Sequence, residues 1–394
     1  MKRIVVLWLV GAVAALGILD HAPAPYVGIG LLASILCFYS FRRVRSTTAK
    51  LLWLNLGIVM AFLCLYELRL VLGQGPTVRY DKSRGYEAET YFVDDADLGY
   101  AAKPSVRIQV SRLVGDRTIY DLTHTIDETG LRISPPVRTS PAPLGCLWFF
   151  GGSYTFGEGV EDDKTMPYRV GMKTKGAYVV RNFGFHGYGP HQMLAELQSG
   201  RSEDRAGCRP THVIYQALVW HAMRSNGRSS WDTNGPYYVL DHQGRPRRLG
   251  SFLDQDLGRP PAWILRRLER SQIYLRHFAK YVDPYQFPLG RDDMRLMIAI
   301  VVESADEIAR RFPGAEFHVL IWNFDEPPYL QMLVEGLAGR GITVELVSDA
   351  IPDYRTVPES TYRLDPLYDR HPTALAHDRI ADYVVREILH QKVE

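Results

Sequence analysis

The chain has few cysteines and almost no net charge, and each feature excludes a class of protein. Four cysteines among 394 residues are too few for a scaffold held together by disulfides. The formal net charge is +2, and no cluster of lysine and arginine is interleaved with aromatic residues, so we expect no nucleic-acid partner. No P-loop is present, and no run of histidine and cysteine has the spacing of metal ligands. We therefore expect neither a nucleotide-binding motif of that type nor a metal site.

Apolar residues, by contrast, are concentrated in three long segments at the start of the chain. They are Ile4–Leu19, Tyr26–Phe41 and Leu51–Tyr66, the last continuing less purely to Leu72. Each has about sixteen uninterrupted residues, slightly fewer than the roughly twenty that span a bilayer, and flanking residues can add the missing turn. We predict a membrane region of three transmembrane helices over residues 1–72.

The first segment has a second interpretation. Lys2 and Arg3 precede it and Ala22-Pro23-Ala24 follows it, which is the pattern of a cleaved secretory signal peptide. We favour a retained helix because two more apolar segments follow at once, and the signal peptide stays open as an alternative. For the second and third segments the alternative is a buried pair of helices in a soluble protein.

The basic residues predict an orientation for these helices. Arg42, Arg43, Arg45 and Lys50 lie between the second and third segments, and basic residues also precede the first. The connection over residues 20–25 has no lysine or arginine. The positive-inside rule then places the N-terminus in the cytoplasm and the last roughly 320 residues outside, whether or not the first segment is cleaved. We expect a bacterial inner (cell) membrane, with the rest of the chain in the periplasm or its extracellular equivalent.

Residues 75–143 have a different pattern, in which β-branched residues alternate with polar ones. Val106–Val110 and Thr118–Ile126 are the clearest examples, and Gly115-Asp116 separates them. This pattern predicts a small β-rich extension that contains an antiparallel hairpin. We find no catalytic motif in it, and expect it to seat the next domain on the membrane region or to form one wall of a binding cleft.

From Leu144 to the C-terminus, candidate strands alternate with helices. Apolar residues between 298 and 312 and between 373 and 389 recur at helical spacing. A long insertion at about 230–290, rich in proline, glycine and arginine, is a candidate lid or specificity region. The pattern predicts an α/β domain over 144–394 with a doubly wound parallel sheet. Its five strands are Cys146–Phe150, Tyr178–Asn182, Val213–Val219, Phe317–Trp322 and Thr343–Val347.

The first of these strands runs into Gly151-Gly152-Ser153-Tyr154-Thr155-Phe156-Gly157-Glu158-Gly159-Val160. The two glycines permit a sharp turn, so Ser153 lies at the carboxyl end of a buried strand, where open parallel sheets bind their ligands. Unpaired backbone N–H groups at the start of the next helix could stabilise an oxyanion there. Ser153 is therefore a candidate nucleophile, although serine also caps helices without any catalytic role.

A nucleophilic serine needs a histidine to accept its proton and a carboxylate to orient that histidine. Asp369-Arg370-His371-Pro372 lies on a predicted loop before the last helix, which would bring it back to the same edge of the sheet. His371 and Asp369 are the candidates, with Asp365 as a second choice for the carboxylate. The alternative for His371 is an ordinary surface histidine.

Three blocks of this sequence resemble those of the SGNH/GDSL serine esterase superfamily. Residues 151–160 are similar to the first block, with Gly152 where the aspartate that names the family usually stands. Residues 182–192, Asn-Phe-Gly-Phe-His-Gly-Tyr-Gly-Pro-His-Gln, resemble the second block, and residues 369–372 resemble the last. The resemblance covers about residues 145 to 390. It implies a flavodoxin-like three-layer sandwich with strand order 2-1-3-4-5, and an enzyme that needs no cofactor.

The resemblance also implies roles for individual residues. Ser153 would be the nucleophile, His371 the general base and then the general acid, and Asp369 the residue that holds the imidazole in place. The backbone N–H groups of Ser153 and Gly187 would form the oxyanion hole. Tyr154 and His186, with parts of the insertion, would line the substrate site.

The chain departs from the family at the end of the third strand. The family usually has an asparagine there whose side chain completes the oxyanion hole, and this chain has Ala217-Leu218-Val219-Trp220-His221-Ala222-Met223-Arg224. His221 is the polar residue nearest to the expected place, so its ring N–H is a candidate donor. Alternatively, His221 packs beneath the insertion and has no catalytic role.

The implied strand order also brings two cysteines near each other. The first and third strands would be neighbours, so Cys146 and Cys208 would lie at the same edge of the sheet. An oxidising compartment permits a disulfide, provided that the Cα atoms lie within about 7 Å. Unpaired buried cysteines are also common on strands.

These observations predict a membrane-anchored, extracytoplasmic serine esterase. The resemblance and the predicted location favour a carbohydrate O-acyl or O-acetyl esterase that acts on an exported polysaccharide or glycolipid. One alternative is an O-acyltransferase of the same fold. Another is a non-catalytic glycan-binding subunit that works with polysaccharide biosynthesis or export proteins. The missing asparagine favours that subunit, whereas Ser153, Asp369 and His371 argue against it.

Overall fold

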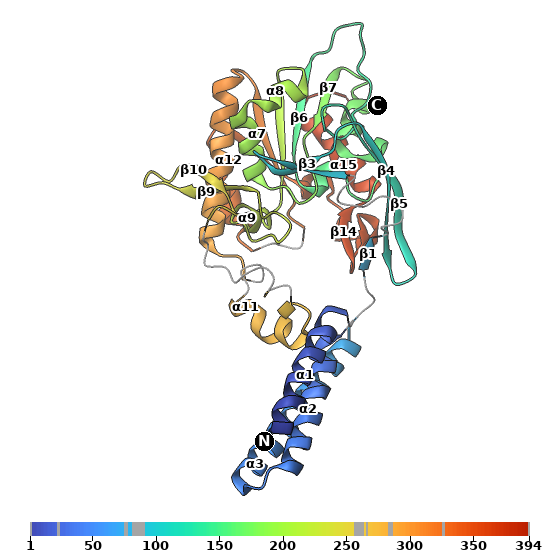
Figure 1. Ribbon diagram of the computed structural model, residues 1–394. Coiled ribbons are helices and arrows are strands. Elements are labelled where there is room, and N and C mark those ends of the chain that lie inside the picture. The colour runs from blue at the N-terminus through green and yellow to red at the C-terminus, as the bar shows by residue number, and fades with distance from the viewer. Residues whose placement is uncertain are drawn as a thin grey trace. The chain divides into compact units, whose positions relative to one another are not determined.

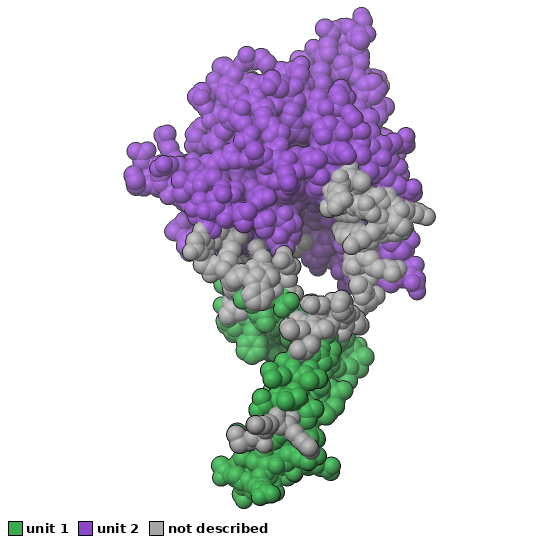
Figure 2. All heavy atoms as spheres, viewed as in Figure 1, with its two compact units in different colours: residues 1–76, 257–288 green, residues 77–256, 289–394 purple. Residues whose placement is uncertain are grey.

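The computed structural model (Figure 1) divides the chain into two compact units, coloured separately in Figure 2. The first unit contains residues 1–76 and 257–288, and the second contains residues 77–256 and 289–394. Ala22 and Pro23, which belong to the signal-peptide alternative, lie outside the described residues. The structure describes residues 2–21, 24–74, 78–80, 91–255, 264, 267–282, 287–324 and 328–392.

Three helices in the first unit correspond to the three apolar segments. They are α1 (Lys2–His21), α2 (Pro25–Arg43) and α3 (Thr47–Leu72). By length and composition, α2 and α3 could each cross a membrane. They pack closely through small residues: the Ser34 hydroxyl donates to the carbonyl oxygen of Gly57 at 3.1 Å.

The second unit is built around a sheet of five parallel strands, in the order β12-β11-β8-β6-β7. Numbered along the chain, this order is 2-1-3-4-5, so the predicted fold class and topology are confirmed. Each strand lies within one or two residues of its predicted range. The bounds are β6 (Gly145–Gly151), β7 (Tyr178–Asn182), β8 (His212–Ala217), β11 (Glu316–Ile321) and β12 (Ile342–Leu346).

Helices cover both faces of this sheet, which explains the uninterrupted apolar run of β6. Trp148 and Phe150 pack with residues of α7, α12 and α13 on one face. Leu147 and Phe149 pack with residues of α6 and α15 on the other. Side chains alternate between the faces of a strand, so a strand buried on both faces has no polar positions. The helices are α6 (Met166–Lys173), α7 (Pro190–Ser199), α12 (Arg291–Arg311), α13 (Leu330–Leu337) and α15 (Ala374–Tyr383).

Short elements at the carboxyl ends of the strands carry the candidate site. Helix α5 (Ser153–Phe156) follows β6, and α9 (His221–Ser225) follows β8. Strand β13 (Arg363–Asp365) pairs with β14 (Asp369–Pro372), just before α15. Asp369 and His371 therefore lie on a short strand, whereas the sequence predicted a loop. The pairing with β13 accounts for the difference, because so short a strand has no periodic pattern of its own.

The β-rich extension contains the predicted hairpin, formed by β4 (Val106–Val114) and β5 (Arg117–Ile126). Strand β1 (Val78–Tyr80) pairs with β4, and β2 (Phe92–Asp95) pairs with β3 (Gly99–Ala102). The extension and the α/β domain belong to the same compact unit. The core of the extension includes Phe156 and Phe185, which belong to the first two sequence blocks.

The insertion at 230–290 is divided between the two units, and its predicted role as a lid or specificity region stays a prediction. Its first part forms the hairpin of β9 (Pro236–Leu240) and β10 (Pro246–Ser251) in the second unit, and residues 257–288 belong to the first unit. There the carboxylate of Glu67 on α3 accepts backbone N–H groups of Gln272 and Ile273 at 2.6 and 2.9 Å. Such a cap depends on residues about two hundred positions apart, so no local pattern reports it. Residues 256–263, 265–266 and 283–286 of the insertion lie outside the described part of the chain.

The two cysteines of the second unit form a disulfide. Cys146 opens β6, Cys208 precedes β8, and their Cα atoms lie 6.2 Å apart. The predicted bridge is confirmed. Cys37 and Cys64, which the sequence placed in the membrane region, are free and buried in the first unit.

Candidate active site

The turn after β6 places Ser153 at the first position of α5. A Cβ atom on Gly152 would lie 2.7 Å from Arg224 Nη1 and 2.9 Å from the carbonyl oxygen of Tyr188, so only glycine fits. As the first residue of a helix, Ser153 has a backbone N–H without an intrahelical acceptor. The turn thus presents both a hydroxyl group and an N–H group at the carboxyl edge of the sheet.

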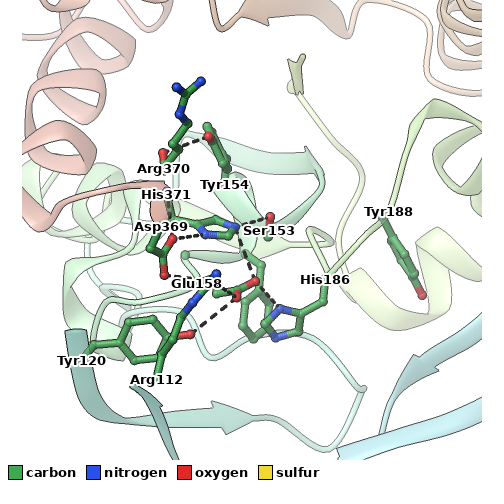
Figure 3. A network of polar contacts seen from close by, with 12 residues as sticks. Arg112, Tyr120, Ser153, Tyr154, Glu158, His186, Tyr188, Asp369, Arg370 and His371 are labelled. Atoms are coloured by element: carbon green, nitrogen blue, oxygen red, sulfur yellow. Dashed lines mark hydrogen bonds and ion pairs between the residues drawn. The ribbon is translucent and has the colours of Figure 1, made fainter. Parts of the chain in front are cut away.

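Ser153, His371 and Asp369 form one row of hydrogen bonds, although the serine and the aspartate lie 216 positions apart in the chain (Figure 3). The Ser153 Oγ lies 2.8 Å from His371 Nε2, and His371 Nδ1 lies 2.6 Å from Asp369 Oδ1. A carboxylate at Nδ1 favours the tautomer in which Nε2 is free to accept the proton of the serine hydroxyl. The structure therefore brings the three predicted residues together in the geometry of a nucleophile, base and orienting acid.

Asp365, the second candidate for the carboxylate that orients His371, instead stabilises a turn. Its Oδ1 accepts the backbone N–H groups of Leu367 and Tyr368, both at 2.9 Å. Its Oδ2 forms an ion pair with Arg117. Asp365 thus holds the turn between β13 and β14, and Asp369 is the residue that contacts the histidine.

The sequence did not reveal the role of Arg112, which holds the other oxygen of Asp369. Its Nη1 lies 2.9 Å from Asp369 Oδ2, and its Nη2 donates to the carbonyl oxygen of Tyr368 at 2.9 Å. The side chain of Asp369 is fully buried, so the guanidinium compensates a charge that water cannot reach. Arg112 belongs to β4 of the extension, and nothing in the local sequence identifies it. The extension therefore supplies part of the site.

A second carboxylate, that of Glu158, flanks the imidazole of His371 (Figure 3). Glu158 Oε2 lies 3.5 Å from His371 Nε2 and 2.8 Å from His186 Nδ1. Glu158 Oε1 lies 3.8 Å from Arg112 Nη1. The sequence offered one signal for this residue, because Glu158 belongs to the same sequence block as Ser153.

This arrangement shifts the ionisation of both partners. Burial lowers the pKa of His371, but the carboxylates of Glu158 and Asp369 outweigh it and hold that pKa above its ordinary value. Burial raises the pKa of Glu158, but His371 and His186 outweigh it, and the pKa of Glu158 lies below its usual range. Each shift favours the charged form of its group relative to that group's ordinary equilibrium in water.

Replacing Glu158 with glutamine should move the pH dependence of turnover. His371 must be neutral to act as a base, so kcat/KM rises with pH through the pKa of His371. Glu158→Gln removes a charge that raises this pKa, and we expect the acidic limb to move to lower pH by about one unit. Glu161→Gln, at an exposed position three residues further along, is the matched control. A limb that stays in place, or moves to higher pH, would contradict the electrostatic role of Glu158.

A cavity of about 690 Å³ opens beside Ser153 and His371. Gly187 lines it with φ +72°, and a Cβ atom there would lie 2.3 Å from Trp231 Nε1. Within the described part of the chain, neither Ser153 nor Gly187 donates its N–H to a backbone acceptor outside the regular helices and strands, as the predicted oxyanion role requires. The other lining residues are Phe92, Tyr100, Arg112, Glu158, His186, Arg224 and Trp231.

The structure places the other predicted site residues differently. His186 lines the cavity, whereas Tyr154 lies against the His371 ring with centroids 5.2 Å apart and lines a separate hollow of about 110 Å³. His221 is fully buried, with Nδ1 2.7 Å from the hydroxyl of Tyr215, and is not among the described residues that line the cavity. The expected roles of Tyr154 and His221 stay predictions.

No family model and no curated protein sequence matches this chain. Several solved structures are similar in fold. A protein assigned to the G-D-S-L lipolytic family from Desulfitobacterium hafniense is 10% identical, with a TM-score of 0.34, covering 61% of this chain and 97% of its own. A carbohydrate esterase family 2 enzyme from Myceliophthora fergusii is 13% identical, with a TM-score of 0.32 and coverage of 71% and 73%. An acetyl xylan esterase from Butyrivibrio proteoclasticus is 10% identical, with a TM-score of 0.34 and coverage of 76% and 86%.

Proposed function

We propose that this chain is a serine esterase, and the hydrogen-bonded row of Ser153, His371 and Asp369 is the observation that carries the proposal. The Ser153 hydroxyl oxygen attacks the carbonyl carbon of an acyl ester while its proton passes to His371 Nε2. Negative charge then develops on the carbonyl oxygen, where the N–H groups of Ser153 and Gly187 can stabilise it. Asp369 stabilises the imidazolium that forms.

The tetrahedral intermediate collapses when the bond to the leaving alcohol breaks, and His371 Nε2–H protonates that alcohol. The acyl group remains on Ser153 as an ester. Water then attacks this acyl-enzyme, with His371 taking the water proton, and a carboxylic acid leaves as Ser153 is restored. Glu158 lies beside Nε2 and stabilises the same imidazolium in both half-reactions.

The substrate class we propose is an acylated glycan or glycolipid. The cavity volume suits a group of the size of a sugar unit with its acyl substituent. Phe92, Tyr100 and Trp231 supply flat aromatic surfaces on which the C–H face of a sugar ring can pack. The polar side chains of Glu158, His186 and His371 line the same cavity as Ser153 and can orient an ester.

We further propose that the site faces the periplasm or cell exterior, with the N-terminal helices as a membrane anchor. The apolar length of α2 and α3 and the basic residues between them support this orientation. A reporter fused after Glu394 should be active only as a periplasmic reporter, and one fused near Arg45 only as a cytoplasmic one. The reverse result would refute the orientation.

Product analysis with the full-length chain in detergent tests the activity. We expect the chain to release acetate from 4-nitrophenyl acetate and from an O-acetylated polysaccharide, and Ser153→Ala to release none above background. An acyl group recovered on an added sugar acceptor instead of in solution would make the enzyme an O-acyltransferase. Absence of Ser153-dependent turnover with every acyl donor would favour the non-catalytic glycan-binding subunit.

A further inference from the structure

Arg224 lies on the segment after β8, which is where the sequence lacks the asparagine of the resembling family. It belongs to α9, the short helix that directly follows β8, and it lines the cavity together with Ser153 and Gly187. The sequence singled out His221 on the same helix, but that ring is fully buried. Arg224, three residues further along, is the polar side chain of α9 that reaches the cavity.

The guanidinium of Arg224 lies close to residues adjacent in sequence to Ser153 and Gly187, the two expected oxyanion donors. Its Nη1 donates to the carbonyl oxygen of Tyr188 at 2.6 Å, and Tyr188 directly follows Gly187. The same nitrogen lies 2.7 Å from the place of a Cβ atom on Gly152, which directly precedes Ser153. The Arg224 guanidinium is therefore close to both chain segments whose N–H groups are expected to donate to the oxyanion.

Among the described residues, no carboxylate lies within ion-pair distance of the Arg224 guanidinium, although the charge of Asp232 acts on it from further away. Within the described residues, Arg224 belongs to none of the ion pairs, whereas the guanidinium of Arg112 is paired with Asp369. The Trp231 ring, with its centroid 5.9 Å from the guanidinium carbon, packs against the head group. A guanidinium has five N–H donors, and the contact with Tyr188 uses one of them. The head group therefore has both charge and donors to offer a ligand in the cavity.

We propose that Arg224 is the third donor of the oxyanion hole, in place of the asparagine of the resembling family. The proposal rests on the proposed esterase function. As the bond from Ser153 Oγ to the carbonyl carbon forms, the electron pair of the carbonyl bond moves to oxygen. Arg224 donates a charged hydrogen bond to that oxygen and keeps its proton.

This assignment connects the two departures of the chain from the resembling family. An aspartate at position 152 would place its Cβ atom against Arg224 Nη1, and its carboxylate would neutralise the guanidinium. Glycine at position 152 leaves room for the guanidinium and preserves its charge. Arginine as an oxyanion donor thus accounts for both departures. It replaces the asparagine that the family has after the third strand, and it requires glycine where the family has aspartate at position 152.

Steady-state kinetics of the full-length chain on 4-nitrophenyl acetate test the proposal. Arg224→Ala should lower kcat about a hundredfold, with a smaller change in KM, because the contact forms in the transition state. Arg224→Lys should keep more activity than Arg224→Ala, since it retains a charged donor. Millimolar guanidinium chloride should restore part of the activity of Arg224→Ala and leave the parent unchanged, which a merely structural arginine would not produce.

Arg228→Ala is the matched control, because that side chain pairs with Asp293 and does not line the cavity among the described residues. We expect its kcat to equal that of the parent. A folded Arg224→Ala variant with parental kcat would overturn the proposal, and so would a loss that neither lysine nor guanidinium relieves. If Arg224→Ala does not fold, Arg224→Gln is measured in its place. We expect the kcat of Arg224→Gln to lie between that of Arg224→Lys and background. A parental kcat for Arg224→Gln would overturn the proposal. A parent without Ser153-dependent turnover would instead refute the esterase function itself.

Discussion

Replacing Ser153 with alanine should lower turnover of a small acyl ester by at least about a thousandfold, and His371→Ala should do the same. The serine hydroxyl lies 2.8 Å from the ring nitrogen that would take its proton, so each residue is ineffective without the other. The double variant should therefore be little worse than either single one. Initial rates on 4-nitrophenyl acetate, measured at equal concentrations of folded protein, provide the comparison.

Asp365→Asn is a suitable control for the Asp369 position, because Asp365 holds the turn before β14 without contacting His371. We expect Asp369→Asn to lose most of the turnover and Asp365→Asn to keep it at the pH optimum. Losses from Ser153→Ala and His371→Ala that multiply in the double variant would show that the two residues act independently. That outcome would contradict the mechanism.

Removing Arg112 should affect both stability and pH dependence. Arg112→Ala leaves Asp369 buried without its partner, and breaking such a pair costs about 3–5 kcal/mol. The guanidinium also lowers the pKa of His371. Its loss should raise that pKa further and move the acidic limb of kcat/KM to higher pH, opposite to the shift expected for Glu158→Gln. Thermal unfolding and a pH–rate profile of the same preparation measure the two effects.

The same hairpin supplies the control for this variant. Arg117 pairs with Asp365 from a side chain that is 60% exposed, and exposed pairs contribute about 0–1 kcal/mol. We expect Arg117→Ala to unfold near the parental temperature and to keep the parental pH profile. Equal losses from Arg112→Ala and Arg117→Ala would mean that the effect belongs to the hairpin in general and not to the ion pair with Asp369.

Local patterns in the sequence predicted the strands of the sheet, and local patterns together with the family resemblance predicted the three residues Ser153, His371 and Asp369. Strand β6 is buried on both faces, so its apolar run was visible, and the glycines after it marked the turn. The order of strands came from the family resemblance. The strands, the turn and the sequence blocks are each recognisable from a short stretch of chain or from the order of such stretches.

The rest of the site depends on contacts between distant segments, which no short pattern reports. In the sequence Arg112 is one arginine of a hairpin, and its role becomes visible only in the fold, where Asp369 of β14 lies 2.9 Å from it. The position of the Arg224 guanidinium depends on its contacts with Gly152 and Tyr188, which belong to two other segments. Glu67 is an acidic residue in an apolar helix until it caps the segment that begins near Gln272. Each is a charged side chain whose partner lies far away in the chain.

Labelling with a fluorophosphonate probe tests the central claim most directly, because the probe bonds covalently only to an activated serine. The full-length chain in detergent should become labelled, and mass spectrometry should locate the phosphonate on the peptide that contains Ser153. Labelling should disappear in Ser153→Ala and fall sharply in His371→Ala. An unlabelled parent that is folded and has an accessible cavity would contradict the claim that Ser153 is a catalytic nucleophile.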